Sequence, residues 1–429
     1  MKRISYILCY AVLVIGLIEG QEQKGGHNQN LPEQLEKLRR LGIKITRQKN
    51  PSGKLEFFIS GEAFDANGFA YNLIGDVEIA KLASIPEVCI CSLDLSHARL
   101  TPQGWRKIAE LRALRELYLA DSNVDDEDLQ YLANLGSLET LDLAWTPMKG
   151  TGLKHVGQIR NLRVLLLTHT KIADEHIAQI VPLTKLEKLD LGGTLVTDKG
   201  MEFVSRLANL KDLRCPESLT DDATKLLARL VQLRTLCVSS SCVTSQGVES
   251  LKTLSELRSL DLSRTKIDDR ALDQIIVLSK LEHLLLSETN ITDAVAPVIG
   301  RFMNLKSLFL DGTKISDSVL QEVGKVHTLE RLNLSKTAVT GEGLQHLTPL
   351  AKLEVLLLNS CKVTDVGAKH LAKLKGLRTL FLWDTALTNM GLLHLANIPN
   401  LEQLWIRSPY ITEGGLKKLK DQKPGLRIN

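Results

Sequence analysis

Three evenly spaced histidines are the first residues in this sequence whose types and spacing could support chemistry. His346, His370 and His394 lie 24 residues apart, and aligned imidazoles are typical ligands of zinc and copper. No carboxylate is placed beside them to complete a ligand set. Because duplication of a Leu-x-His-Leu unit produces the same alignment without any metal, we predict that this row is structural and binds no metal.

Recurrent aspartates raise the question of acid-base catalysis. Asp94, Asp142, Asp190 and Asp261 each stand between two leucines, and two carboxylates can hydrolyse a glycosidic bond when their environments differ. Tyr118 interrupts the series, so no two neighbouring acids are available for distinct roles. The sequence also lacks usable phosphate-binding glycine loops, nucleophile elbows, zinc-binding histidine pairs and calcium loops. We therefore predict no enzymatic activity and no cofactor.

The seven cysteines form neither a disulfide framework nor a zinc-type pair. Cys89 and Cys91 make a Cys-x-Cys on an expected strand, and Cys215 takes the place of a core leucine. We interpret the cysteines as structural residues and predict no metal or redox site at Cys89 and Cys91.

A 24-residue period positions all of these side chains. The first leucine of the Leu-x-Leu motif or of its variants recurs fourteen times from Leu93 to Leu404, and every step is 24 residues except the 23-residue step from Leu213 to Leu236. Alternation across Leu-x-Leu predicts a short strand that directs two leucines into the core and the residue between them outward. The missing residue falls near Pro216, in the turn after a strand, so both flanking arrays stay in phase.

The second half of each unit predicts a short helix. Apolar residues three apart, such as Leu272, Ile275 and Leu278, suit one helix face. A Thr, Ser or Asp precedes the helix in most units and can cap its first amides. An acid such as Asp198 often follows, and we expect it to interact with the positive end of its own helix. Glycine recurs near the helix start, as at Gly367, which we attribute to close packing of neighbouring helices. One such unit cannot bury its own apolar face, so the units must stack into a continuous core.

The repeating unit Leu-x-x-Leu-x-Leu-x-x-Thr-x-Val-Thr-Asp-x-Gly-Leu-x-x-Leu resembles that of bacterial leucine-rich-repeat proteins, notably exported ones of the planctomycete type. The resemblance covers roughly residues 88–429. It implies an α/β leucine-rich-repeat solenoid: a curved horseshoe with a parallel sheet on its concave face, short helices on its convex face, about 14 repeats and a cap at each end. The repeats are also similar to those of F-box leucine-rich-repeat proteins, so the motif specifies the fold better than the function.

The N-terminus predicts an exported protein. Residues 1–20 combine Lys2 and Arg3 with an apolar run and a final small residue, which is typical of a secretory signal peptide. We expect a periplasmic, envelope or secreted location, with a membrane tether if the segment is not cleaved. Residues 21–30 are then a polar linker.

The rest of the chain divides into two predicted regions. Residues 31–87 are expected to form an N-terminal cap with a degenerate repeat and an insert, and residues 88–429 the repeat domain with its C-terminal cap. Within the N-terminal cap we predict a helix over 31–48, a strand over 55–59 and a second helix over 76–85.

Large side chains at outward strand positions mark a candidate ligand-binding surface. Most outward positions carry small residues, but Phe381, Trp383, Trp405 and Arg407 depart from this pattern on neighbouring strands, beside Leu357. Trp and Arg dominate binding hot spots. Covering the last core layers would also explain large residues at these positions. Phe309 lies further back along the array. Weaker ligand contacts are predicted elsewhere on the concave face, at Tyr118, Arg214 and Arg331.

Together these features predict a non-enzymatic interaction scaffold that binds a protein or an envelope polymer through its concave face. The net charge of +4 is spread along the chain, so the sequence does not predict a basic surface that binds nucleic acid. The alternative is an intracellular ubiquitin-ligase-type substrate adaptor similar to F-box leucine-rich-repeat proteins. That alternative requires an F-box before the repeats, and residues 31–48 are too few to form one.

Overall fold

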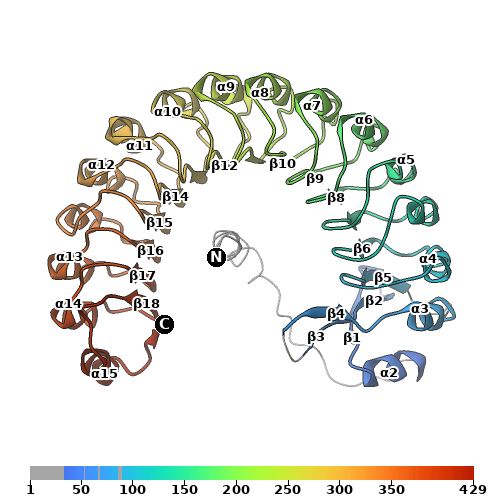
Figure 1. Cartoon of the computed structure of the whole chain (residues 1–429), viewed down its shortest axis with the longest axis horizontal. Coiled ribbons are helices and arrows are strands. Elements are labelled where there is room, and N and C mark those ends of the chain that lie inside the picture. Colours follow the sequence, from blue (N-terminus) through green and yellow to red (C-terminus); the bar gives the residue numbers. More distant parts are fainter. Residues whose placement is uncertain (1–32, 53, 66–67, 86–88) are drawn as a thin grey trace.

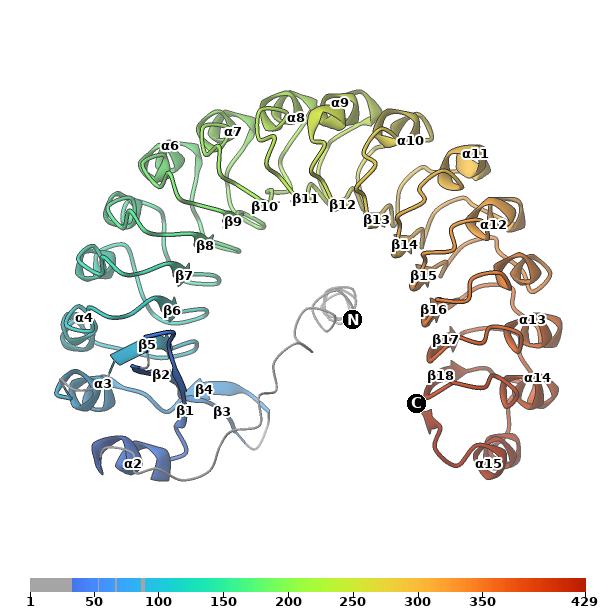
Figure 2. The ribbon, with the colours of Figure 1, turned by 180° about the vertical axis from the view of Figure 1, so that it is seen from behind.

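The computed structural model describes residues 33–52, 54–65, 68–85 and 89–429. The predicted signal peptide and polar linker lie outside these ranges. The chain curves into an open arc with strands along its inner face and helices along its outer face (Figure 1), and the view from behind shows the same two layers (Figure 2). The predicted leucine-rich-repeat solenoid is therefore confirmed. No helix within the described ranges is long and apolar enough to cross a membrane.

One continuous sheet of 17 strands lines the concave face. Consecutive strands pair in parallel from β2 to β19, with the equivalent leucines of neighbouring repeats in register, as in Leu236 beside Leu260. The strands of this sheet are β1 (Lys44–Lys49), β2 (Leu55–Ser60), β5 (Cys89–Asp94), β6 (Glu116–Tyr118), β7 (Thr140–Asp142), β8 (Val164–Leu166), β9 (Lys188–Asp190), β10 (Asp212–Arg214), β11 (Thr235–Cys237), β12 (Ser259–Asp261), β13 (His283–Leu285), β14 (Ser307–Phe309), β15 (Arg331–Asn333), β16 (Val355–Leu357), β17 (Thr379–Trp383), β18 (Gln403–Arg407) and β19 (Arg427–Ile428).

Short helices cover the convex face. They form in the second half of the repeats, where apolar residues three apart predicted a helix. The α-helices are α2 (Glu33–Arg40), α3 (Asp76–Ala83), α4 (Pro102–Ile108), α5 (Leu153–Val156), α6 (Asp174–Ile177), α7 (Asp198–Val204), α8 (Asp221–Leu227), α9 (Ser245–Ser250), α10 (Arg270–Ile275), α11 (Ala296–Ile299), α12 (Asp317–Val323), α13 (Asp365–Leu371), α14 (Asn389–Leu395) and α15 (Glu413–Gln422). Short 3₁₀ helices supplement or replace them at η1 (Asp128–Tyr131), η2 (Ala178–Ile180), η3 (Leu251–Thr253), η4 (Asp293–Val295) and η5 (Gly343–Leu347).

The core is a ladder of aliphatic side chains between these two layers. In the repeat that contains strand β12, Leu260 and Leu262 are fully buried. Thr265 of the same unit is also buried. Its Oγ1 atom donates to the carbonyl oxygen of Leu262 at 2.6 Å, and this hydrogen bond replaces the one that water would make. Each repeat can therefore bury one polar side chain at little cost.

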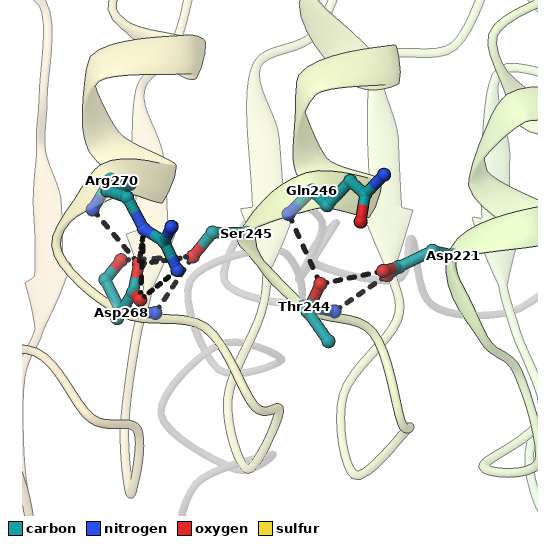
Figure 3. Close-up of polar contacts among 6 residues, drawn as sticks. All are labelled: Asp221, Thr244, Ser245, Gln246, Asp268 and Arg270. Atoms are coloured by element: carbon teal, nitrogen blue, oxygen red, sulfur yellow. Dashed lines mark hydrogen bonds and ion pairs between the residues drawn. The ribbon is translucent and has the colours of Figure 1, made fainter.

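Carboxylates join successive repeats along the helix layer. Asp221 accepts both the backbone amide and the hydroxyl of Thr244 in the next repeat, at 2.7 and 2.6 Å (Figure 3). We expected such acids to act on the positive end of their own helix. Instead they bind the residue that caps the neighbouring helix, while Thr244 itself accepts the amide of Gln246 at 3.2 Å. The acid of one repeat thus positions the helix of the next.

The direction of this contact reverses once, in the middle of the solenoid. Ser245 occupies the acidic position, and Asp268 of the following repeat supplies the carboxylate, so that Ser245 Oγ donates to Asp268 Oδ1 at 2.7 Å (Figure 3). The amide of Asp268 donates back to Ser245 Oγ at 2.9 Å. Arg270 binds the same carboxylate at 2.7 Å. The link between the two repeats survives although its donor and acceptor have changed places.

These carboxylates explain several of the glycines that recur near helix starts. An added Cβ at Gly200 would lie 2.6 Å from Asp174 Oδ1, and one at Gly247 would lie 2.2 Å from Asp221 Oδ1. Gly367 follows the packing argument made from the sequence, because a Cβ there would come within 2.9 Å of the Cα atom of Gly341 in the preceding repeat. The glycine therefore makes room for the preceding repeat, at the cost of helix propensity.

The N-terminal region departs from one prediction. The helix expected over 31–48 ends at Arg40, because Gly42 adopts a φ of +92° and the chain reverses. Residues Lys44–Lys49 then form strand β1, which pairs antiparallel with β2. In this strand, hydrogen bonds to β2 take the place of the hydrogen bonds that the backbone would have made within a longer helix. The boundaries of the cap at 31–87 stay a prediction.

The insert between β2 and α3 contains a small hairpin, and an ion pair ties β2 to the repeats. Strands β3 (Glu62–Phe64) and β4 (Ala70–Asn72) pair antiparallel in a separate two-stranded sheet. Glu56 of β2 is buried and binds the guanidinium of Arg115, with Nη2 and Oε2 2.5 Å apart. Asn50 donates to the second carboxylate oxygen of Glu56 at 3.2 Å. The N-terminal strands and the second repeat are therefore joined by charge as well as by the sheet.

Candidate functional site

The predicted aromatic side chains come together on the last strands of the concave face. Strands β17 and β18 are five residues long, whereas most strands in the array have three. Phe381 lies beside Trp405 in parallel register, and the extra residues place Trp383 beside Arg407. Because alternate residues of a strand point to the same side, all four side chains lie on the concave surface. We call these four residues the C-terminal aromatic cluster.

Ring contacts hold the cluster together. Phe381 and Trp405 stack with 5.5 Å between ring centroids and an angle of 8° between their planes. Trp383 meets Trp405 edge to face, with centroids 5.9 Å apart and planes at 73°. Both arrangements are favoured for aromatic pairs. Phe381 is only 8% exposed and forms the base, while the two indoles are half-buried and present ring surface to solvent.

Arg407 forms the charged edge of the cluster and is anchored on two sides. Its guanidinium carbon lies 5.9 Å from the ring centroid of Trp383, within the range of a cation-π contact. Its Nη2 atom also binds Asp384 Oδ1 at 2.9 Å. Asp384 belongs to the turn that follows β17 and has a φ of +56°. A positive charge is therefore held in a defined orientation at the edge of an apolar patch.

The other predicted contacts fall into two groups. Leu357 lies on β16 in register with Phe381, so it extends the cluster by one repeat. Phe309 on β14 is only 3% exposed and offers little surface to a ligand. Tyr118 on β6 lies in the opposite arm of the arc (Figure 1). Burial, aided by Glu116, raises the pKa of Tyr118 to about 12, so its phenol stays protonated.

The two predicted arginines stay apart from the cluster. Arg214 on β10 lies beside Asp190, with Nε and Oδ1 4.0 Å apart. Arg331 begins β15, two strands before β17. Neither belongs to the contiguous surface around Trp383 and Trp405.

The strand aspartates accept hydrogen bonds from their own backbone. Asp142 Oδ1 accepts the amide of Ala144 at 2.9 Å, and Asp190 Oδ1 accepts that of Gly192 at 2.9 Å. Burial raises the pKa of Asp142, and the charges of Asp190 and Asp94 add to this effect while the amide of Ala144 opposes it. These carboxylates bind the backbone just after the strand, which accounts for their recurrence in successive repeats.

The aligned histidines lie on the convex side, at η5, α13 and α14. The Nδ1 atom of His370 is buried and has no hydrogen-bond partner. Among the residues that the structure describes, no group of three or more His, Cys, Asp or Glu side chains is arranged to hold a metal. The interpretation that duplication of the repeat produced this alignment stays a prediction.

An exposed tryptophan outside the strands was not predicted from the sequence. Trp145 is 55% exposed, and its ring centroid lies 3.8 Å from that of His169 in the next repeat. Both residues follow a strand and have φ values near +60°, at +61° and +56°. Their position in the repeat is otherwise polar or small, so a tryptophan there was a visible signal. Trp145 lies in a turn, outside the outward strand positions that mark the predicted ligand-binding surface. The remaining tryptophan, Trp105, is fully buried in α4.

Comparison with known proteins identifies the repeat type. A family described as a leucine-rich repeat region matches residues 91–270, and a second described as a leucine-rich repeat matches residues 327–347 and 350–372. No curated protein sequence matches the chain.

Solved structures share the fold at low sequence identity. The Leptospira interrogans leucine-rich-repeat protein LIC12759 has a TM-score of 0.58 and 22% identity, covering 82% of this chain and 91% of that one. A structure of a TDR receptor has a TM-score of 0.52 and 19% identity, covering 79% of this chain and 59% of that one. An internalin from Listeria monocytogenes has a TM-score of 0.49 and 24% identity, with 75% and 82% covered. At these identities the similarity to the first two structures establishes the fold alone.

Proposed function

Since this chain is a leucine-rich-repeat protein, we propose that it is a non-enzymatic scaffold that binds a protein ligand at the C-terminal aromatic cluster. The observation that carries the proposal is the half-buried pair of indoles, Trp383 and Trp405, packed on Phe381 and bordered by Arg407. Tryptophan and arginine are the side chains most enriched among residues that dominate protein-protein affinity. The contacts within the cluster also fix the rings in advance, which lowers the entropic cost of binding.

The chemistry of the surface favours a ligand with an apolar side chain beside a negative charge. The indole rings offer an apolar surface, and Arg407 supplies donors for a carboxylate. Arg407 is shared with Asp384, so an incoming acid competes with that carboxylate for the same guanidinium. A peptide segment with an aromatic or aliphatic residue next to Asp or Glu satisfies both halves of the surface.

A quantitative capture experiment tests the site. The full chain is immobilised and exposed to envelope extract as the parent, as the Trp383→Ala/Trp405→Ala double variant, and as Trp145→Ala, which removes an exposed tryptophan from the other arm. We expect one or more proteins to be retained by the parent and by Trp145→Ala and lost by the double variant. Calorimetry with the purified partner should then show at least about a tenfold weakening, equivalent to 1.4 kcal/mol. Equal retention by all three chains, with unchanged circular dichroism, would contradict the proposed site.

Export is the second part of the proposal and depends on residues 1–20, which precede the described structure. The charged start, the apolar run and the small residue before Gln21 support a cleaved signal peptide. N-terminal sequencing of the protein isolated from its native host should begin close to Gln21, in the fraction outside the cytoplasm. Recovery of a cytosolic protein that retains Met1 would instead support the intracellular adaptor.

A further inference from the structure

The two cysteines of the Cys-x-Cys segment face each other at close range. Cys89 and Cys91 lie on β5, and their Sγ atoms are only 3.2 Å apart. Residues two apart on a regular strand have Cα atoms about 6.6–6.8 Å apart, close to the upper limit for a disulfide. Spacing along the sequence therefore gave no reason to expect a bond between them, in keeping with the prediction of no redox site at this pair. The distance between the two sulfur atoms argues against that prediction.

A β-bulge explains the short distance. Strand β5 pairs with β2 through Phe57 with Ile90 and then Phe58 with Ser92, so Cys91 is an extra residue without a partner in this ladder. A bulge bends and locally shortens the strand that carries the extra residue. In this bulge it turns the Cys91 side chain toward that of Cys89.

The surroundings make the two thiols unequal. Cys91 is 2% exposed, whereas Cys89 is only half-buried. Burial, together with the neighbouring Cys89, raises the pKa of Cys91 to about 12. An oxidant in solution therefore reaches Cys89 first, because thiolate character and access control thiol reactivity.

We propose that Cys89 and Cys91 form a site of reversible oxidation, closing into a disulfide within strand β5. Cys89 attacks the sulfur of a small disulfide oxidant and displaces one thiol. Cys91 then loses its proton, attacks Cys89 Sγ, and releases the second thiol. The two cysteines together lose two protons and two electrons, and the oxidant accepts both and leaves as two thiols. The product ties the bulge at the junction between β2 and the first Leu-x-Leu strand.

The site also lies beside the ion pair that joins β2 to the repeats. The charges of Glu56 and Arg115 both act on Cys91, and Arg115 binds Glu56 from the second repeat. Closure of the bond changes the position of Cys91 Sγ next to Arg115. Oxidation of Cys89 and Cys91 should therefore alter the ion pair between Glu56 and Arg115, which joins the N-terminal strands to the solenoid.

A single tryptic peptide tests the proposal. Cleavage after Lys81 and Arg99 yields residues 82–99, which contain both cysteines and no other. The folded full chain is treated with oxidised or reduced glutathione, then denatured, alkylated with N-ethylmaleimide and digested. After oxidation we expect this peptide without alkyl groups and two hydrogen atoms lighter than its reduced form. After reduction we expect it with two alkyl groups.

The controls keep each outcome decisive. Cys242 is exposed and reports that the oxidant acted, through a glutathione adduct. Its tryptic peptide, residues 235–252, also contains Cys237, so fragment spectra must assign the adduct to Cys242. In Cys89→Ser the remaining Cys91 should be alkylated after either treatment, because its proposed partner has gone. The proposal is overturned if the parent peptide takes two alkyl groups while Cys242 is modified. It is also overturned if Cys89 keeps a glutathione without closure, or if either cysteine is linked to another peptide.

Discussion

The carboxylate of Asp174 accepts the backbone amide of Thr197 through one oxygen and its hydroxyl through the other, each at 2.7 Å. Thr197 belongs to the following repeat and caps α7 by accepting the amide of Lys199 at 3.3 Å. The same oxygen of Asp174 that binds the Thr197 amide also accepts the amide of Gly200 at 2.9 Å. One side chain thus satisfies the free start of a neighbouring helix, where backbone amides have no partner within the helix.

Replacement of this acid should weaken the solenoid. Asp174→Ala leaves two amides and a hydroxyl without their acceptor, and hydrogen bonds to a charged group contribute more than neutral ones. We expect a loss of about 1–3 kcal/mol in the free energy of unfolding, measured by urea denaturation. Glu175→Ala is the matched control because Glu175 is exposed in the same helical turn. Equal stability of the two variants would refute a role for this contact.

Gly200→Ala should destabilise the protein, although alanine is the better helix former. The new Cβ would lie 2.6 Å from both Asp174 Oδ1 and Val196 Cγ1, so this clash must outweigh the gain in helix propensity of about 1 kcal/mol. At Gly136 a Cβ meets nothing within 4 Å, and Gly136→Ala should leave the thermal midpoint almost unchanged. Adding Asp174→Ala to Gly200→Ala should recover part of the loss, as a double-mutant cycle would show. Additive losses would mean that the carboxylate is not the obstacle.

The buried strand acids should make stability depend on pH in a defined direction. The folded pKa of Asp142 is raised, chiefly by burial, so its ionised form destabilises the fold at neutral pH. This penalty is lost as the pH falls through the folded pKa toward the unfolded value of about 4. Asp142→Asn keeps the acceptor oxygen, as Asn333 does at the equivalent position with the amide of Ser335 at 3.1 Å.

Accordingly, Asp142→Asn should be more stable than the parent at pH 7, and the difference should shrink at about pH 3, where both side chains are neutral. Urea denaturation at the two pH values measures this difference. A constant difference across the range would show that burial of the charge is not its cause.

Two aromatic residues of the C-terminal cluster should separate a structural role from a binding role. Phe381 is 8% exposed and lies beneath Trp405, so Phe381→Ala should cost about 3–5 kcal/mol of stability through the cavity it leaves. Trp383 is half-buried and meets Trp405 by its edge, so Trp383→Ala should cost only about 1 kcal/mol. Chemical denaturation measures both changes. If Trp383→Ala lost as much stability as Phe381→Ala, the result would indicate that Trp383 covers the last core layers and does not serve a ligand site.

The sequence predicted the strands, the core and the order of the repeats because these depend on local periodicity. Each Leu-x-Leu became a strand with both leucines inside, as Leu260 and Leu262 illustrate. The proximity of Phe381, Trp383 and Trp405 was predictable for the same reason, since a constant period places equivalent positions of successive repeats side by side. Where the period was absent, before residue 88, the helix predicted over 31–48 was wrong beyond Arg40.

Contacts between repeats were decided by the tertiary structure alone. The sequence placed Asp198 at the start of its own helix, but only stacking brings its carboxylate to Thr220 of the next repeat. The exposure of Trp145 depends on a left-handed turn residue, and the approach of Cys89 to Cys91 depends on the bulge opposite β2. Periodicity specifies which side chains are buried. The distance between two atoms also depends on how neighbouring segments bend and stack, and no single repeat contains that information.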